Sequence, residues 1–141
     1  MNTDGHRFKK KQLTERIIGC AYEVANELGP GFLEPAASSA EPKVYENALV
    51  HELRKAALGV KPQHALEVKY DGVVVGEYSA DMIVEDSVIV EVKAVKRIND
   101  IHKAQCLNYL RATGLELCLL LNFGSPRVEI KRIILDRPSN A

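Results

Sequence analysis

The sequence predicts one small α/β (α+β) domain built on a central mixed β-sheet with flanking helices. A chain of 141 residues has room for a single hydrophobic core. Helical periodicity fills the first part of the chain, and short β-rich runs follow after Pro62. A strand, a helix and a wholly apolar strand then come in succession, which indicates a parallel strand pair. The expected order of elements is ααβββαββ.

The two helices expected near the N-terminus are separated by a loop. Apolar residues recur at steps of three and four from Leu13 to Leu28, and the triplet Gly29-Pro30-Gly31 ends this helix. The second helix is expected from about Lys43 to Leu58, with Gly59 as the left-handed residue at its end. Residues 35–43 contain two prolines and small residues without periodicity, so we interpret them as a loop insertion.

The sheet is expected from the β-rich runs that follow. The first three runs occupy residues 65–70, 73–85 and 88–95. Asp71-Gly72 between the first two is a strong signal for a hairpin. A helix that begins at Asn99-Asp100 and closes at Gly114 leads to the apolar run Leu117–Leu121, which predicts a right-handed crossover. A last run, Val128–Leu135, has the pattern of an edge strand.

The composition is that of an ordinary globular domain, with 46% hydrophobic and 27% charged residues. No apolar run approaches the ~18 residues of a membrane span, so no membrane association is expected. The N-terminus lacks the apolar stretch of a secretory signal, and we expect a cytoplasmic location. The 19 basic and 19 acidic residues cancel, which argues against binding to nucleic acid by bulk charge. We expect a flexible basic arm at 1–12, a single domain at 13–136 and a tail at 137–141.

The second predicted hairpin places charged side chains together. Glu91 and Lys93 point to the same face because side chains alternate along a strand. A two-residue loop at Asp86-Ser87 would mix apolar and charged faces, whereas a three-residue loop, Glu85–Ser87, keeps them apart. The three-residue register puts Asp81 directly opposite Glu91, with β-carbons roughly 4.5–5.5 Å apart.

Two carboxylates at that separation repel each other, and a cation between them allows both to stay ionised. Oxygen ligands of this kind suit Mg²⁺ or Mn²⁺, which complete their shells with water and phosphate oxygens. The Lys93 ammonium could orient a metal-activated water and offset charge in the transition state, a combination that fits phosphodiester hydrolysis. The alternative is that Asp81, Glu91 and Lys93 are solvent-facing charges on a half-exposed hairpin.

These residues also resemble a known pattern. Asp81, followed ten residues later by Glu91-Val92-Lys93, resembles the PD-(D/E)XK nuclease superfamily. Six ordered stretches between about Ile17 and Leu135 are similar to the GxxExxY proteins within it; they are residues 28–34, 44–49, 76–81, 89–95, 105–110 and 121–124. The resemblance implies a PD-(D/E)XK nuclease-like fold, nuclease activity and dependence on Mg²⁺.

The resemblance also implies an acidic residue from a helix that completes the metal site. Gly31 and Glu34 match the naming motif of the family, but the insertion of about eight residues displaces Tyr45. Glu34 precedes the insertion, whereas Glu46 lies on the second helix. Both stay candidates, with a slight preference for Glu46, and either could be a solvated helix glutamate. The expected metal ligands are therefore Asp81, Glu91 and Glu46.

Further candidates surround this set. Gln105 matches a helix glutamine that lies near the metal and the substrate in related nucleases. Residues expected to contact the substrate, or to form a solvated polar face, are Lys96, Arg97, His102, Lys103 and Tyr109.

The leading hypothesis is a divalent-metal-dependent nuclease that hydrolyses phosphodiester bonds in DNA, in preference to RNA, by a metal-activated water. The alternative is a catalytically impaired nuclease-fold module that binds nucleic acid or a protein partner, because the insertion interrupts the first motif. Whether the chain forms a homodimer stays open.

Overall fold

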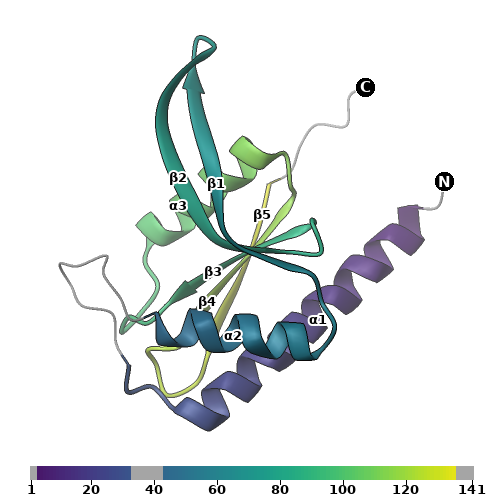
Figure 1. The fold of residues 1–141 in the computed structure, drawn as a ribbon, viewed down its shortest axis with the longest axis vertical. Helices are drawn as coiled ribbons and strands as arrows, with labels where there is room; N and C mark the ends of the chain where they lie inside the picture. The colour runs from purple at the N-terminus through teal and green to yellow at the C-terminus, as the bar shows by residue number, and fades with distance from the viewer. Residues whose placement is uncertain (1–2, 33–42, 136–141) are drawn as a thin grey trace.

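The computed structural model describes residues 3–32 and 43–135, with side chains in the first helix from residue 9 onward (Figure 1). Its elements are α1 (Thr3–Leu28), α2 (Val44–Lys55), β1 (Val60–Tyr70), β2 (Val73–Val84), β3 (Val88–Lys93), α3 (Asp100–Thr113), β4 (Leu117–Asn122) and β5 (Glu129–Ile134). The predicted order ααβββαββ is confirmed. Residues 35–42 of the expected insertion and the tail at 137–141 lie outside the described residues. No helix in the described ranges is long and apolar enough to cross a membrane.

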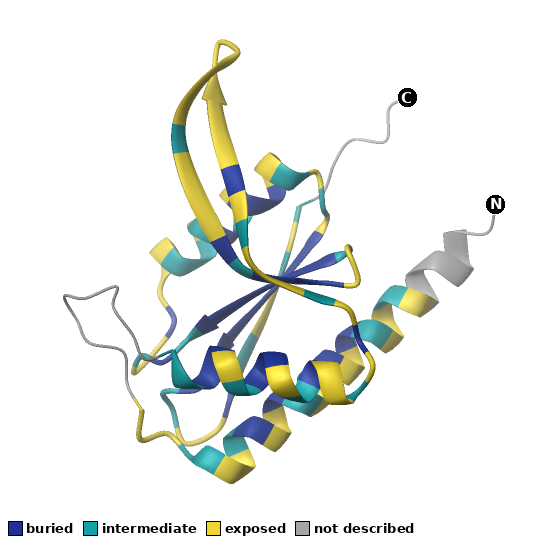
Figure 2. Cartoon of the chain, viewed as in Figure 1, coloured by how far each residue is buried: buried dark blue, intermediate teal, exposed yellow. Residues whose placement is uncertain are grey.

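The five strands form one mixed sheet in the order β1-β2-β3-β4-β5. Among the strands of the described residues, only β3 and β4 pair in parallel, and α3 makes the connection between them, as the strand–helix–strand pattern predicts. The helices α1 and α2 pack on one face of the sheet and α3 packs on the other (Figure 1). The central strands are buried on both faces (Figure 2), which explains the unbroken apolar run of β4.

The boundaries of both N-terminal helices differ from the expectation. Helix α1 begins at Thr3 rather than Leu13, so residues 3–12, expected to be an arm, are helical. These residues include lysines and a glutamine, which favour a helix without any apolar periodicity. Helix α2 ends through Ala57, which has the left-handed φ of 63° that was expected at Gly59. The Leu58 N–H donates to the Leu53 carbonyl (3.0 Å), so the buried Leu58 closes the helix end.

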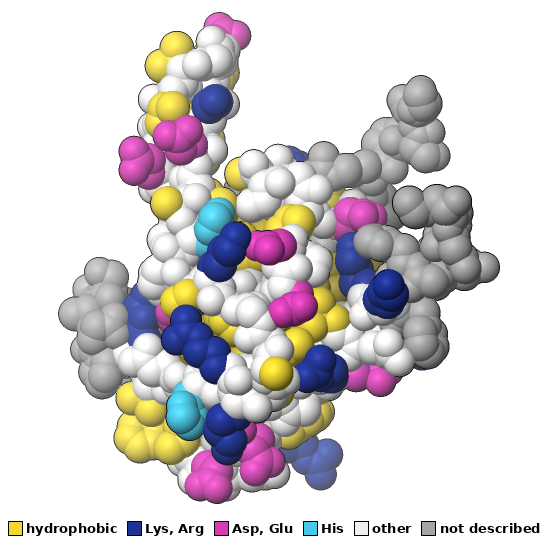
Figure 3. All heavy atoms as spheres, turned by 45° about the vertical axis from the view of Figure 1, so that its right-hand side comes forward, with side chains coloured by type: hydrophobic (Ala, Val, Ile, Leu, Met, Phe, Trp, Pro, Cys, Tyr) yellow, Lys and Arg dark blue, Asp and Glu magenta, His cyan; other side chains and the backbone are white. Residues whose placement is uncertain are grey.

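The long hairpin of β1 and β2 projects from the body of the domain (Figure 1). β3 pairs with β2 only between residues 82 and 84, which leaves the outer half of the hairpin with solvent on both faces. Figure 3 shows hydrophobic side chains among acidic ones on this projection. Its exposed large hydrophobic residues are Val68, Tyr70, Val73, Val74, Val75 and Tyr78.

Candidate active site

The register that brings the catalytic candidates together is confirmed. Met82 pairs with Val90, and Val84 pairs with Val88, as the three-residue loop predicts. This loop contains no glycine; Glu85 and Asp86 adopt the left-handed conformation, with φ of 52° and 54°.

The side-chain alternation along β2 changes at Asp81. Strict alternation would put Ala80 and Met82 on the same face. Ala80 instead packs on the α3 side of the sheet, whereas Met82 packs on the side of α1 and α2. Gln63, between the two β1 residues that pair with Met82 and Ala80, has a left-handed φ of 52°. Both strands therefore depart from regular pleating at the level of Asp81.

Two hydrogen bonds connect Asp81 with the strand that carries Glu91. The Asp81 N–H donates to Glu91 Oε2 (2.7 Å), and the Val92 N–H donates to Asp81 Oδ2 (2.8 Å). The β2–β3 pairing runs only as far as Met82 and Val90, so these bonds replace the ladder where the strands separate. The structure thus brings the two carboxylates together between the strands, each anchored to the backbone of the other strand.

The Glu91 carboxyl is buried, with 3% of the residue exposed. Burial raises its pKa to about 9, and the neighbouring Asp81 carboxylate adds to the rise. The bond from the Asp81 N–H and the Lys93 ammonium act in the opposite direction. Without a metal ion, Glu91 therefore holds a proton at neutral pH, and a bound cation would supply the positive charge that this carboxyl lacks.

A buried asparagine fixes the segment that follows Lys93. Asn122 Oδ1 accepts a hydrogen bond from the Val95 N–H (2.9 Å), and its Nδ2 donates to Glu129 Oε1 (3.2 Å). The same Glu129 oxygen accepts a bond from the Ile98 N–H (3.3 Å). The Lys93 carbonyl in turn accepts a bond from the Phe123 N–H, directly after β4 (2.8 Å). These bonds set the direction of the chain as it leaves β3.

Gly124 allows this segment to pass close to the end of β4. A β-carbon at this position would lie 2.3 Å from the Val95 carbonyl oxygen and 2.5 Å from the Val95 nitrogen. Because both contacts are with backbone, we expect Gly124→Ala to lower the free energy of unfolding by about 1–3 kcal/mol. Chemical denaturation measures this change. The matched control is Gly19→Ala in α1, where an added β-carbon meets no atom within 4 Å. This variant is expected to be at least as stable as the natural protein. An equal loss of stability in both variants would contradict the account.

Glu46 reaches the sheet near Asp81, and its carboxylate contacts Gln63 and Lys43. Its carboxylate accepts a hydrogen bond from Gln63 Nε2 and lies 3.8 Å from Lys43 Nζ. Gln63 Oε1 accepts a bond from the Ser79 hydroxyl (3.1 Å). Across residues 3–32 and 43–135, no three His, Cys, Asp or Glu side chains are grouped so as to hold a metal ion. The described structure thus supplies a carboxylate pair rather than a triad, and Glu34 lies outside the described residues.

Tyr45, the tyrosine displaced by the insertion, fastens the end of α1 to the start of α2. Its hydroxyl donates to the Gly29 carbonyl and accepts from the Phe32 N–H (3.1 Å). Its ring stacks on Phe123 at the end of β4, with centroids 5.0 Å apart. The insertion breaks the spacing of the naming motif, but Tyr45 still holds the start of α2, and with it Glu46, against the end of β4.

Helix α3 covers the face of the sheet toward which Glu91 points. Tyr109 is buried against this face, and burial raises the pKa of its hydroxyl, with smaller contributions from the Glu91 and Asp81 carboxylates. Gln105 lies one turn earlier on α3 and is half-buried. Both candidates from this helix are therefore on the same side as the carboxylate pair.

The basic residues expected to contact the substrate fall into two groups. Lys96 and Arg97 are exposed on the segment between β3 and α3. His102 instead caps α3, because its Nδ1 accepts a bond from the Asn99 N–H (3.2 Å), and Lys103 Nζ lies 4.0 Å from Asp100. His102 and Lys103 thus have structural roles in addition to any contact with substrate.

Sequence reasoning missed Gln63, Asn122 and Glu129. The stretch 121–124 was recognised only as a family motif, although an asparagine and a glycine after an apolar strand already indicate close backbone contacts. For Gln63 no sequence signal was present, because its conformation depends on the departure of β2 from β3.

A mixed sheet that carries an Asp on one strand and Glu-x-Lys on the next, with a helical crossover behind them, defines a nuclease-type α+β fold. The chain belongs to the PD-(D/E)XK nuclease superfamily, whose family model matches residues 11–133. The closer likeness to the GxxExxY proteins stays a resemblance.

Two solved structures are similar to the chain. The crystal structure of SSO0001 has a TM-score of 0.50 and 21% sequence identity, covering 66% of this chain and 50% of that chain. An alkaline exonuclease (LHK-Exo) from Laribacter hongkongensis has a TM-score of 0.43 and 14% identity, covering 83% of this chain and 68% of that chain. The match thus spans half the length of SSO0001. No protein of curated function shows significant sequence similarity to the chain.

Proposed function

We propose that this protein is a divalent-metal-dependent nuclease that hydrolyses phosphodiester bonds in DNA, in preference to RNA. The observation that carries the proposal is the reciprocal pair of hydrogen bonds between Asp81 and the Glu91 strand, which holds two carboxylates together at a buried position. Two carboxylates, with the remaining positions left to water and phosphate oxygens, suit Mg²⁺ or Mn²⁺. Membership in the nuclease superfamily supports the same reaction class.

Each residue of the site has a distinct expected role. Asp81 and Glu91 would hold the ion, which supplies a polarised phosphoryl oxygen and a water of lowered pKa. The Lys93 ammonium, on the same face of β3 as Glu91, orients the attacking water and offsets the charge that develops on the phosphate. Gln105 and Tyr109 border the substrate side, and the exposed Lys96 and Arg97 attract the phosphate backbone.

Glu46 is the preferred third carboxylate in this proposal. Its partner Gln63 lies across from Asp81 in the β1–β2 pairing, so Glu46 reaches the sheet at the level of the pair. Its present bonds to Gln63 and Lys43 also support the alternative, a catalytically impaired module that binds nucleic acid without cutting it. A cytoplasmic location and a homodimer stay predictions.

Cleavage assays test the proposal and separate the alternative. Labelled single- and double-stranded DNA and RNA are incubated with the protein in Mg²⁺, Mn²⁺ or EDTA. We expect cleavage of DNA with either metal, none in EDTA, and none by Asp81→Asn. The matched control is Asp71→Asn at the exposed tip of the hairpin, where φ of 54° suits asparagine. Cleavage that survives EDTA would refute metal dependence, and binding without cleavage would favour the impaired module.

A further inference from the structure

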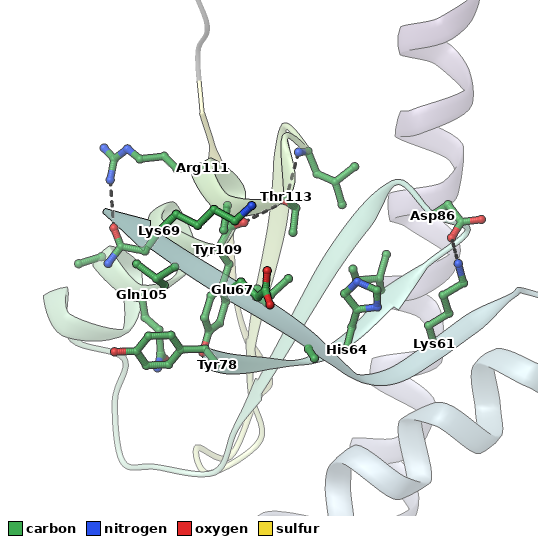
Figure 4. Close-up of a pocket in the computed structure, with 18 of the residues that line it drawn as sticks. Lys61, His64, Glu67, Lys69, Tyr78, Asp86, Gln105, Tyr109, Arg111 and Thr113 are labelled. Carbon is green, nitrogen blue, oxygen red and sulfur yellow. Dashed lines mark hydrogen bonds and ion pairs between the residues drawn. The ribbon is translucent and has the colours of Figure 1, made fainter. Parts of the chain in front are cut away.

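A groove of about 1360 Å³ runs between the β1–β2 hairpin and α3 (Figure 4). Its floor includes the buried side chains of Leu66 and Ile83. The volume exceeds the ~300–1,000 Å³ typical of pockets for a single small molecule. The outer half of the hairpin, which contributes Val68, Lys69 and Tyr78 to the lining, stands clear of the rest of the domain (Figure 2). Its shape therefore suits an extended chain rather than a compact ligand.

The groove extends to Tyr109, which lies beside the candidate active site. Gln105 and Tyr109 of α3 line it, and the Tyr109 hydroxyl lies close enough to the Glu91 and Asp81 carboxylates for them to raise its pKa. Ile83 on its floor pairs with Ile89, and Glu91 follows Ile89 on the same face of β3. A polymer that lies in the groove is thus led toward Asp81 and Glu91.

The lining offers both cations and an aromatic surface. Lys69 on β1 and Arg111 on α3 stand on opposite walls (Figure 4). A third cation, Lys61, is paired with Asp86 (2.7 Å) toward the other end, and Glu67 is the remaining acidic residue. Two cations against one free carboxylate leave the groove weakly positive, although the whole chain has no net charge.

Tyr78 contributes the aromatic surface. It projects from β2 into the groove near Gln105 (Figure 4), and 56% of the residue is exposed. An exposed ring beside cationic side chains is the combination that binds unpaired bases, because bases stack on the ring while phosphates meet the cations. A duplex keeps its bases inside and would leave the ring and the apolar floor of the groove without a partner.

We propose that this groove binds a single-stranded segment of nucleic acid and leads its backbone to the Asp81–Glu91 pair. The proposal rests on the proposed nuclease function, which it deepens by naming the substrate class as single-stranded. It assigns Tyr78 to base stacking, and Lys69 and Arg111 to phosphate contacts.

Fluorescence anisotropy tests the groove without requiring cleavage. The full chain is titrated at low salt, in EDTA, into labelled oligothymidylate and into a duplex of equal length. We expect the single strand to bind at least tenfold more tightly than the duplex. Tyr78→Ala should weaken single-strand binding by about five- to tenfold, at the lower end of what loss of one stacked base produces, while Tyr78→Phe should keep it.

Matched surface variants serve as controls. Tyr22→Ala removes a tyrosine of similar exposure, 48%, from α1 on the other face of the sheet, and should bind as the natural chain does. Arg111→Ala should weaken binding and reduce its salt dependence, whereas Arg54→Ala on the exposed surface of α2 should not. Equal affinity for duplex and single strand, equal losses in Tyr78→Ala and Tyr22→Ala, or no binding at all would overturn the proposal. Binding with these preferences but without cleavage in Mg²⁺ would support the groove and refute the nuclease activity.

Discussion

Replacing Lys93 by alanine is expected to lower the rate of DNA cleavage by about 10²–10³-fold. The ammonium lies on the same face of β3 as Glu91, two residues along the strand, where it can stabilise charge that develops only in the transition state. Its loss should therefore reduce kcat, while the affinity for DNA should change by no more than about twofold. Single-turnover cleavage and anisotropy measure the two effects separately.

The control for this variant is Lys131→Ala. Lys131 is exposed on β5 at the edge of the sheet, so the same loss of charge and length occurs away from the site. It should cleave at the rate of the natural protein. If Lys93→Ala cleaves as fast as Lys131→Ala, the lysine has no part in catalysis, and if both variants fail equally, the effect is one of general charge.

Replacing Glu91 by glutamine is expected to stabilise the metal-free protein and to abolish its binding of metal ions. The folded protein favours the protonated carboxyl, since its pKa is raised from 4.5 to about 9. At neutral pH Glu91 is ionised in the unfolded chain and must take up a proton on folding, and the amide removes this cost of roughly 1–3 kcal/mol. The glutamine oxygen can still accept the bond from the Asp81 N–H.

The pH dependence of this gain has a definite sign. Below the unfolded pKa of 4.5 Glu91 is protonated in both states, so the variant and the natural protein should be equally stable. As the pH rises toward about 9, the natural protein loses stability that the variant keeps, and the difference grows. Thermal unfolding in EDTA at several pH values measures it. The exposed Glu27→Gln should show no such trend, and a Glu91→Gln variant that is less stable at pH 7 would contradict the burial argument.

The register of the catalytic hairpin was predictable because only one loop length keeps Met82 and Val84 paired with apolar residues. The conformation of that loop was less predictable, since Glu85 and Asp86 take left-handed φ values that usually fall to glycine. The change of face at Asp81 was not predictable, because it arises where β2 pairs with β1 on one side and separates from β3 on the other.

The third carboxylate could not be assigned from the sequence for a related reason. The partners of Glu46 depend on Gln63, whose backbone conformation follows from the irregular pairing beside Asp81. The role of Asn122 likewise depends on a long-range contact with Val95, although the stretch that contains it was singled out by resemblance. Local patterns thus identified the strands, whereas the side-chain bonds between distant segments needed the structure.

Calorimetric titration with Mn²⁺ tests most directly whether Asp81 and Glu91 form a metal site. We expect the natural protein to bind Mn²⁺ in a saturable manner and Mg²⁺ to compete for the same site. We expect Asp81→Asn and Glu91→Gln each to lose this binding while remaining folded. The Glu27→Gln control should bind as the natural protein does. Equal Mn²⁺ binding by the natural protein and both site variants, or metal-dependent cleavage by Glu91→Gln, would contradict the assignment of the metal to this pair.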